Sequence, residues 1–286
     1  MKSSVISGII AVINNFYGRY DMAMELKDRY SIQDLIDIVT RLRQPDGCPW
    51  DKVQTHQSIK KSMIEETYEA IDALDSGDDH AFANELGDVL LQVVFHAVMA
   101  DERGAFDFDD IVKEICTKLI TRHTHVFGED KAGNEEEALT NWEKNKKKEK
   151  NIGTYTGVLK DVPKHLPALM RAEKIQKKAR GFGFDWDNVD DVFAKVGEET
   201  NELKEAISGS DEHVREEYGD LLFAVVNLGR FLGTDPETAL TAASNKFIKR
   251  FEIMEETARS EGEDIADLSI DEMDKYWERA KQEENV

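Results

Sequence analysis

The sequence is poor in cysteine and proline, and each shortage excludes a class of protein. Its 286 residues include only two cysteines, Cys48 and Cys116, which argues against a disulfide-stabilised scaffold and a cysteine-rich zinc site. Two isolated thiols are typical of a reduced compartment, so we expect a cytoplasmic location. The five prolines, together with many Glu, Ala, Leu and Lys residues, suit long uninterrupted helices.

Positive charge is in deficit relative to negative charge. The chain carries 59 acidic and 37 basic residues, which gives a formal net charge of −22. A protein without a dominant basic surface is poorly suited to bind the phosphate backbone of a nucleic acid. We therefore expect no nucleic-acid partner. Nucleotides remain compatible with this charge, because a divalent cation bridges a polyphosphate to carboxylates.

Several common motifs are missing from the sequence. It contains no D-x-D-x-D-G calcium loop, no G-x-x-x-x-G-K phosphate loop and no G-x-S-x-G nucleophile motif. No alternating apolar pattern of useful length predicts a strand. The apolar stretch at residues 5–13 is far too short to span a bilayer, so we expect no membrane partner. We interpret residues 1–30 as an N-terminal extension or mis-assigned start, in preference to a surface helix or an export signal.

The sequence does contain one acidic motif that occurs twice. The first copy reads E-E-T-Y-E at 65–69 and E-L-G-D at 85–88, and the second reads E-E-T-N-E at 198–202 and E-Y-G-D at 217–220. Three further blocks recur in the same order: G-C-P-W-D and G-F-G-F-D (47–51, 181–185), K-L-I-T-R and K-F-I-K-R (118–122, 246–250), and W-x-x-x-K (142–146, 277–281). Four blocks in one order indicate a tandem duplication.

The duplication predicts the domain organisation. We place a first domain at residues 31–148, a linker at 149–167 and a second domain at 168–286, because 286 residues accommodate two ordinary domains. Apolar residues recur at helical spacing in each copy, and S-G-D-D at 76–79 separates two such helices, as S-G-S-D does at 208–211. We predict an all-α fold of two tandem helical bundles.

The acidic motif suggests a metal site. Carboxylates three residues apart lie on one face of a helix, so each copy directs four of them from two helices to one point. These are Glu199, Glu202, Glu217 and Asp220 in the second copy and Glu66, Glu69, Glu85 and Asp88 in the first. Unneutralised charges so close repel each other, and hard oxygen ligands favour Mg²⁺, with Mn²⁺ also suitable. A solvated acidic helix face is the alternative, which two copies in matched register disfavour.

Two glycines inside the predicted helices need an explanation. Gly87 and Gly219 each cost about 1 kcal/mol relative to alanine in a helix interior. We expect them where two helices approach closely around the metal.

Cationic and aromatic residues accompany the acidic motif. Lysine and arginine suit phosphate oxygens, and tryptophan offers a flat face to a base. Those of the second copy stand one turn before the acids or four residues apart: Lys195, Lys246, Arg250, Trp277 and Lys281. Beside a metal cluster, this set predicts a nucleoside polyphosphate as the ligand.

Together these motifs resemble the tandem-domain bacterial MazG proteins. The resemblance rests on G-C-P-W-D, E-E-T-Y-E, E-L-G-D, the segment L-P-A-L-M-R-A at 166–172 and the W-x-x-x-K tail, and it covers residues 31–284. It implies an all-α, homodimeric nucleoside triphosphate pyrophosphohydrolase. With Mg²⁺ such an enzyme cleaves ribo- and deoxyribonucleoside triphosphates to the monophosphate and pyrophosphate. A narrower dUTPase-like pyrophosphatase, a non-catalytic nucleotide sensor and a purely structural helical repeat are the alternatives.

The resemblance also implies roles for residues of the second copy. Its metal ligands would be Glu199, Glu202, Glu217 and Asp220. Its nucleotide-binding residues would be Lys195, Glu198, Lys246, Arg250, Trp277 and Lys281, with Glu198 also orienting the attacking water. The family typically has a lysine four residues before the third carboxylate, where this chain has His213, with Arg215 as a nearby substitute.

The two copies differ in positive charge. The first copy keeps its acids and Trp142 but has uncharged residues at three positions: Ser62 for Lys195, Ala81 for His213 and Thr121 for Lys249. Phosphate binding needs cations opposite the metal. We therefore expect the main active site in the second copy, while the first binds metal, holds the dimer or retains weak activity.

Overall fold

The computed structural model of the chain describes residues 26–149 and 153–283, and these contain helices but no strand. The predicted all-α fold is confirmed. The chain divides into two compact units, Met1–Lys146 and Lys147–Val286. The apolar stretch at 5–13, with the rest of residues 1–25, lies outside the described residues, so its interpretation stays a prediction.

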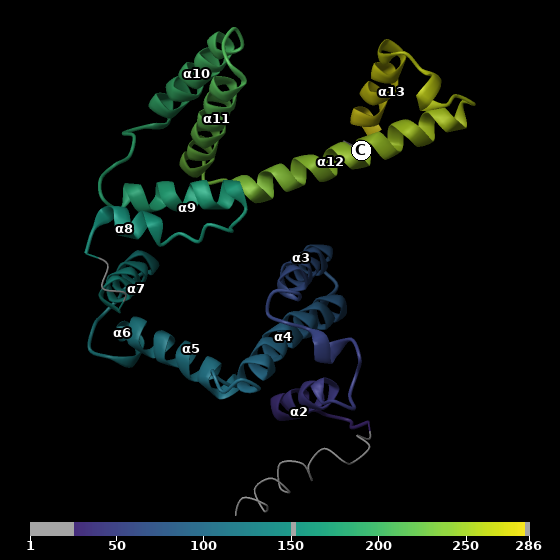
Figure 1. Cartoon of the computed structure of the whole chain (residues 1–286). Coiled ribbons are helices and arrows are strands. Elements are labelled where there is room, and N and C mark those ends of the chain that lie inside the picture. Colours follow the sequence, from purple (N-terminus) through teal and green to yellow (C-terminus); the bar gives the residue numbers. More distant parts are fainter. Residues whose placement is uncertain (1–25, 150–152, 284–286) are drawn as a thin grey trace, which may run out of the picture. The chain divides into compact units, whose positions relative to one another are not determined.

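The first unit is built mainly from a pair of long helices and the helix that packs on them (Figure 1). Its elements are α2 (Ile32–Arg43), the 3₁₀ turn η1 (Asp51–Val53), α3 (Lys60–Ser76), α4 (Asp79–Asp101), α5 (Phe108–Arg122), α6 (Thr124–Phe127) and α7 (Glu135–Glu149), which runs across the boundary.

The break between α3 and α4 lies at the predicted S-G-D-D segment. Gly77 ends α3 with φ of +74°, the left-handed conformation that glycine adopts without strain. Asp78 then caps α4, because its carboxylate accepts hydrogen bonds from the backbone N–H groups of His80 (2.9 Å) and Ala81 (3.1 Å). These local signals return the chain along α3, and the two helices pack along each other.

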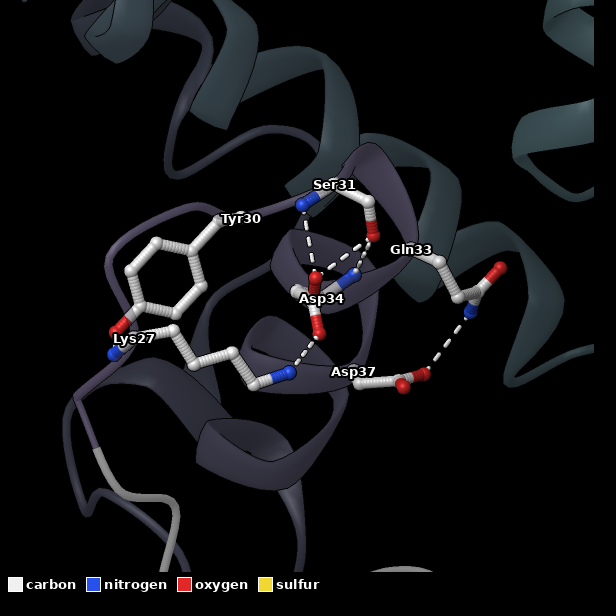
Figure 2. A network of polar contacts seen from close by, with 6 residues as sticks. All are labelled: Lys27, Tyr30, Ser31, Gln33, Asp34 and Asp37. Carbon is white, nitrogen blue, oxygen red and sulfur yellow. Dashed lines mark hydrogen bonds and ion pairs between the residues drawn. The ribbon is translucent and has the colours of Figure 1, made fainter.

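A polar network fixes the start of α2 (Figure 2). The Ser31 hydroxyl accepts a hydrogen bond from the Asp34 backbone N–H (3.2 Å), and the Asp34 carboxylate accepts one from the Ser31 N–H (2.8 Å), which forms a capping box. Lys27 places its ammonium 2.5 Å from the same carboxylate, and this hydrogen bond is the largest of the interactions that hold the pKa of Asp34 below its usual range. The network therefore holds the segment before α2 against the helix.

The apolar core of the first unit explains the composition of α4. Among the described residues, α4 is the one helix long and apolar enough to cross a membrane. Its second half supplies Val94, Phe95, Val98 and Met99 to a buried cluster that also contains Val39 of α2. Packing inside the unit accounts for the apolar character of this half of the helix.

A histidine pair lies at the edge of this core and predicts a pH dependence. The Nδ1 atoms of His56 and His96 are 2.7 Å apart and the rings are stacked. Burial, and then the neighbouring His56, lower the pKa of His96. The unfolded chain therefore binds a proton more readily than the folded one, and stability is lost as the pH falls below the ordinary value near 6.5. We expect the melting temperature to fall between pH 7.5 and 5.5.

The variant His96→Gln isolates this effect. It should reduce the fall in melting temperature over that pH range, measured by calorimetry. The matched control is His80→Gln, on the exposed start of the same helix, which should keep the full fall. Equal pH dependence in all three proteins would contradict the assignment.

The second unit repeats the helical pair and adds a longer arm. It contains α8 (Tyr155–Lys160), α9 (Ala168–Arg180), α10 (Val189–Ala206), α11 (Asp211–Phe231), α12 (Pro236–Ser260), the 3₁₀ turn η2 (Ile265–Asp267) and α13 (Ile270–Glu283). α10 and α11 pack along each other, α11 also packs on α9, and α13 packs on α12. The segment interpreted as a linker, 149–167, includes α8, which packs against α9.

Candidate metal and nucleotide site

Three carboxylates of the second unit come together between two helices. Glu199 and Glu202 lie three residues apart on α10, and Glu217 projects from α11. One oxygen from each lies within 4.8 Å of the other two. The packing of α10 on α11 brings the two faces together, as the i, i+3 spacing predicts. Such a group of oxygen donors could hold a metal ion.

A lysine neutralises part of this charge. The Lys195 ammonium lies 2.7 Å from Glu199 Oε1 and 2.9 Å from Glu198 Oε1. These hydrogen bonds, that to Glu199 first, raise the pKa of Lys195 above its usual range. Partial removal from water, and then the charge of Glu199, raise the pKa of Glu202. The cluster therefore holds more negative charge than one lysine compensates.

The fourth predicted ligand, Asp220, lies outside the close group of three. It lines a cavity of about 480 Å³ together with Lys195 and Glu199. Asp220 thus faces the same space as the cluster, one turn further along α11 than Glu217.

A histidine stands at the outer edge of the cluster. His213 Nδ1 lies 3.4 Å from Glu217 Oε1. Arg215, the other candidate for this position, directs its Nε–H to the backbone carbonyl of Asp211 at 3.2 Å. His213 therefore lies beside Glu217, whereas the Nε–H of Arg215 is bonded to the backbone of its own helix.

The remaining predicted nucleotide ligands gather on the α12–α13 arm. Lys246 and Arg250 are on α12, and Trp277 and Lys281 are on α13. The Trp277 ring packs against Phe247 of α12, with ring centroids 5.0 Å apart. None of these four described residues lines the cavity beside the acidic cluster. The four residues thus lie on one arm, and they do not line the cavity beside the acidic cluster of their own chain.

The first unit has a similar acidic group with different surroundings. Oxygens of Glu66, Glu85 and Asp88 lie within 4.8 Å of one another, and Glu69 lies outside this group. Partial burial, and then the charge of Asp88, raise the pKa of Glu66. Arg122 of α5 and Lys146 of α7 lie over the ring of Trp142 on α7, 5.2 Å and 4.7 Å from its centroid.

The explanation offered for two helix glycines is wrong. A Cβ atom added to Gly87 or Gly219 would meet no atom within 4 Å. Close approach of helices within one chain therefore does not require either glycine, because both α-carbons face open space.

A polar network that was not predicted from the sequence holds the loop before α10. Arg230 of α11, whose side chain is almost fully buried, pairs with Asp185 of that loop, with Nη1 3.0 Å from Oδ2. Its Nε and Nη2 groups also donate to Asn227 Oδ1 at 3.0 Å and 2.8 Å. The loop turns at Gly183, whose φ of +83° favours glycine. The available signal was the pair of polar residues at positions 227 and 230, where the first copy has Phe95 and Val98.

Comparison with known proteins identifies relatives along most of the chain. The family described as the MazG nucleotide pyrophosphohydrolase domain matches twice, at residues 54–127 and 188–254. The nucleoside triphosphate pyrophosphohydrolase/pyrophosphatase MazG of Thermotoga maritima is 46% identical over 251 residues, which cover 87% of this chain and 95% of that protein. The nucleoside triphosphate pyrophosphohydrolase of Escherichia coli K12 is 44% identical over 258 residues, covering 88% and 98%.

A third relative has a different length. The uncharacterized protein YabN of Bacillus subtilis is 48% identical over 249 residues, which cover 86% of this chain but 51% of that protein. Each of the two family matches contains one copy of the acidic motif. The T. maritima and E. coli relatives are matched over nearly their whole length. The chain belongs to the MazG family.

Proposed function

We propose that the protein is a Mg²⁺-dependent nucleoside triphosphate pyrophosphohydrolase with its main active site in the second unit. It converts ribo- and deoxyribonucleoside triphosphates to the monophosphate and pyrophosphate. The observation that carries this proposal is the cluster of Glu199, Glu202 and Glu217 with Lys195 at its edge and a cavity beside it. The names of the T. maritima and E. coli relatives support the same activity.

The donor set supports a hard divalent cation. All three grouped ligands are carboxylates, and oxygen donors suit Mg²⁺ or Mn²⁺ better than metals that prefer nitrogen or sulfur. We assign Asp220 as a fourth ligand, since it faces the same cavity. When bound, the cation supplies positive charge against the triphosphate and lowers the pKa of the attacking water.

The chain's own residues position the substrate and the water. Lys195 is fully protonated and lies at the cavity, so it can contact phosphate oxygens once the charge of Glu199 is neutralised. Glu198 is exposed beside it, and we assign it the role of orienting the attacking water. Attack at the α-phosphorus releases pyrophosphate, and catalysis is mainly positioning and charge stabilisation.

We assign the residues of the α12–α13 arm to nucleotide binding within a homodimer. Lys246, Arg250, Trp277 and Lys281 do not line the cavity of their own chain, so a second copy is needed to supply them. Large apolar side chains on the α10–α11 pair are 41–54% exposed and offer an interface: Phe193, Tyr218, Leu222, Phe223 and Val225. Light scattering of the purified protein measures its mass and so tests whether it is a homodimer. With a net charge of −22 and two cysteines, we place this dimer in the cytoplasm without nucleic-acid or membrane partners.

A substrate panel separates this proposal from its rivals. Pyrophosphate release from many triphosphates supports a broad pyrophosphohydrolase, and turnover of one nucleotide supports a dUTPase-like enzyme. Binding without turnover supports a nucleotide sensor, and indifference to both Mg²⁺ and nucleotides supports a structural repeat.

The bond that is cleaved gives a further prediction. If water attacks the α-phosphorus, hydrolysis of ATP in ¹⁸O-labelled water should place the label in AMP, measured by mass spectrometry. The products should be AMP and pyrophosphate, without ADP. Label in pyrophosphate or orthophosphate would show that a different phosphorus is attacked.

A further inference from the structure

We propose that the cavity beside the acidic cluster of the second unit binds the nucleobase of the substrate, with Trp186 as its stacking surface and Gln176 and Asn227 as its hydrogen-bonding groups. The proposal rests on the proposed function, because it assumes a nucleotide at this site. It assigns the base to a position other than Trp277, which lines no part of this cavity.

The cavity has the size and composition of a small-molecule site. Its volume is about 480 Å³, within the roughly 300–1,000 Å³ typical of ligand pockets. Lys195, Glu199 and Asp220 line one part of it. The rest is mainly apolar and comes from α8, α9 and α11, through Leu159, Ile175, Ala179, Phe223 and Ala224. A triphosphate held at the charged part leaves the apolar part for the base.

Gln176 offers a buried hydrogen-bond acceptor. This side chain lines the cavity from α9 and is 6% exposed. Its Nε2 group donates to the backbone carbonyl of Phe223 at 2.8 Å. A carbonyl only accepts, so the amide orientation is fixed. Its Oε1 atom is buried and has no hydrogen-bond partner among the described residues. An unpaired buried acceptor is costly, and an N–H group of a ligand would satisfy it.

Asn227 offers a donor. Its Oδ1 atom accepts two hydrogen bonds from Arg230, and a guanidinium group only donates, so this amide orientation is fixed as well. Its Nδ2 group makes no hydrogen bond within the part of the chain that the structure describes. A cavity with one amide acceptor and one amide donor suits a nucleobase, because each base carries a donor beside an acceptor on its pairing edge.

Two aromatic side chains border the same cavity. Phe184 and Trp186 line it from the loop before α10, and they are 83% and 43% exposed. The ion pair of Asp185 with Arg230 holds this loop on α11. Aromatic faces stack with any base, so they bind nucleotides without strong base preference. In the first unit, the positions of Asn227 and Arg230 hold Phe95 and Val98, which pack in the apolar core, so the polar groups are specific to the second unit.

Steady-state kinetics with and without a base test the proposal. KM and kcat are measured for ATP, UTP and the base-free analogue ribose 5-triphosphate. Trp186→Ala should raise KM for ATP and UTP roughly 10-fold, as expected for the loss of one stacking contact, with kcat nearly unchanged. Its kcat/KM for ribose 5-triphosphate should stay at the wild-type value. Asn227→Asp, which keeps an acceptor for Arg230 but removes the donor, should alter the ratio of KM values for ATP and UTP.

The matched control is Trp50→Ala, an exposed tryptophan of the first unit that lines no part of this cavity, which should leave KM and kcat unchanged. Circular dichroism verifies the folding of each variant. The proposal is overturned if Trp277→Ala raises KM only for substrates that carry a base while Trp186→Ala and Asn227→Asp do not. It is also overturned if the cavity variants lose activity equally with all three substrates. If the wild type releases no pyrophosphate, the proposed function fails instead. Equilibrium binding of ATP and of ribose 5-triphosphate to the wild type and Trp186→Ala then decides the cavity proposal by the same comparison.

Discussion

Glu199→Gln should abolish pyrophosphate release while leaving the helical content unchanged. Glu199 is the buried member of the carboxylate group, and its Oε1 accepts a hydrogen bond from the Lys195 ammonium at 2.7 Å. The change removes one negative ligand but keeps the shape of the side chain. Loss of a single group that stabilises transition-state charge typically costs about 10²–10³-fold in rate. The loss here should be at least that large, because Glu199 both holds the cation and orients Lys195.

The fold should tolerate the substitution. Partial removal from water, and then the charge of Glu199, raise the pKa of Glu202, so removal of the Glu199 charge relieves repulsion in the metal-free protein. Its melting temperature without Mg²⁺ should equal or exceed that of the wild type. Glu205→Gln, an exposed change on the same helix, is the matched control and should keep full activity. Asp220→Asn should also be inactive. Normal turnover in both Glu199→Gln and Asp220→Asn would refute the site.

The parts of the structure set by local sequence were predictable. The breaks between paired helices follow from Gly77, which adopts the left-handed conformation, and from the caps Asp78 and Ser210. The grouping of Glu199 with Glu202 follows from helical periodicity, and the second copy of the motif made the inference specific. Each of these features depends on residues within one helical turn of each other or on an exact repeat.

The cavity depended on packing that a single sequence does not encode locally. Gln176 and Asn227 come from different helices and meet the loop of Trp186 only when α9, α10 and α11 pack together. A polar pair in the otherwise apolar second half of α11 was the only signal, and it becomes meaningful when compared with Phe95 at the matching position of the first copy. The expectation for Gly219 failed for a related reason: a helix glycine signals close packing only if a neighbour approaches it.

The four-residue spacing of the cationic and aromatic residues predicted that the two members of each spaced pair share a helix. It did not predict which acidic cluster they lie beside. Lys246 and Arg250 lie on one helix, and Trp277 packs on the same helix through Phe247. Their location on the α12–α13 arm therefore agrees with the four-residue spacing in the sequence. Whether an arm serves its own cluster or that of a second copy depends on assembly, which helical periodicity does not specify.

Substitutions in the second unit should reduce pyrophosphate release far more than equivalent substitutions in the first unit. Ser62 stands at the position of Lys195 and Ala81 at that of His213, so the first unit lacks two cationic contacts to phosphate. Each charge-assisted contact contributes about 1.5–3 kcal/mol. Two such losses weaken nucleotide binding by roughly two orders of magnitude or more. Its core residues Phe95 and Val98 also replace the polar groups of the second-unit cavity.

The double variant Glu66→Ala with Glu69→Ala should therefore keep most of the pyrophosphate release. Lys195→Ala should raise KM or lower kcat by at least about tenfold, the equivalent of one lost charge-assisted hydrogen bond. Lys204→Ala, an exposed change on the same helix, should behave as the wild type. Steady-state kinetics on folded variants distinguishes the two units. A substitution in the catalytic site should change KM or kcat even when the melting temperature is unchanged. If the first-unit variant is folded but inactive while Lys195→Ala is nearly normal, catalysis takes place in the first unit, since its acidic group is then the one that acts on the substrate.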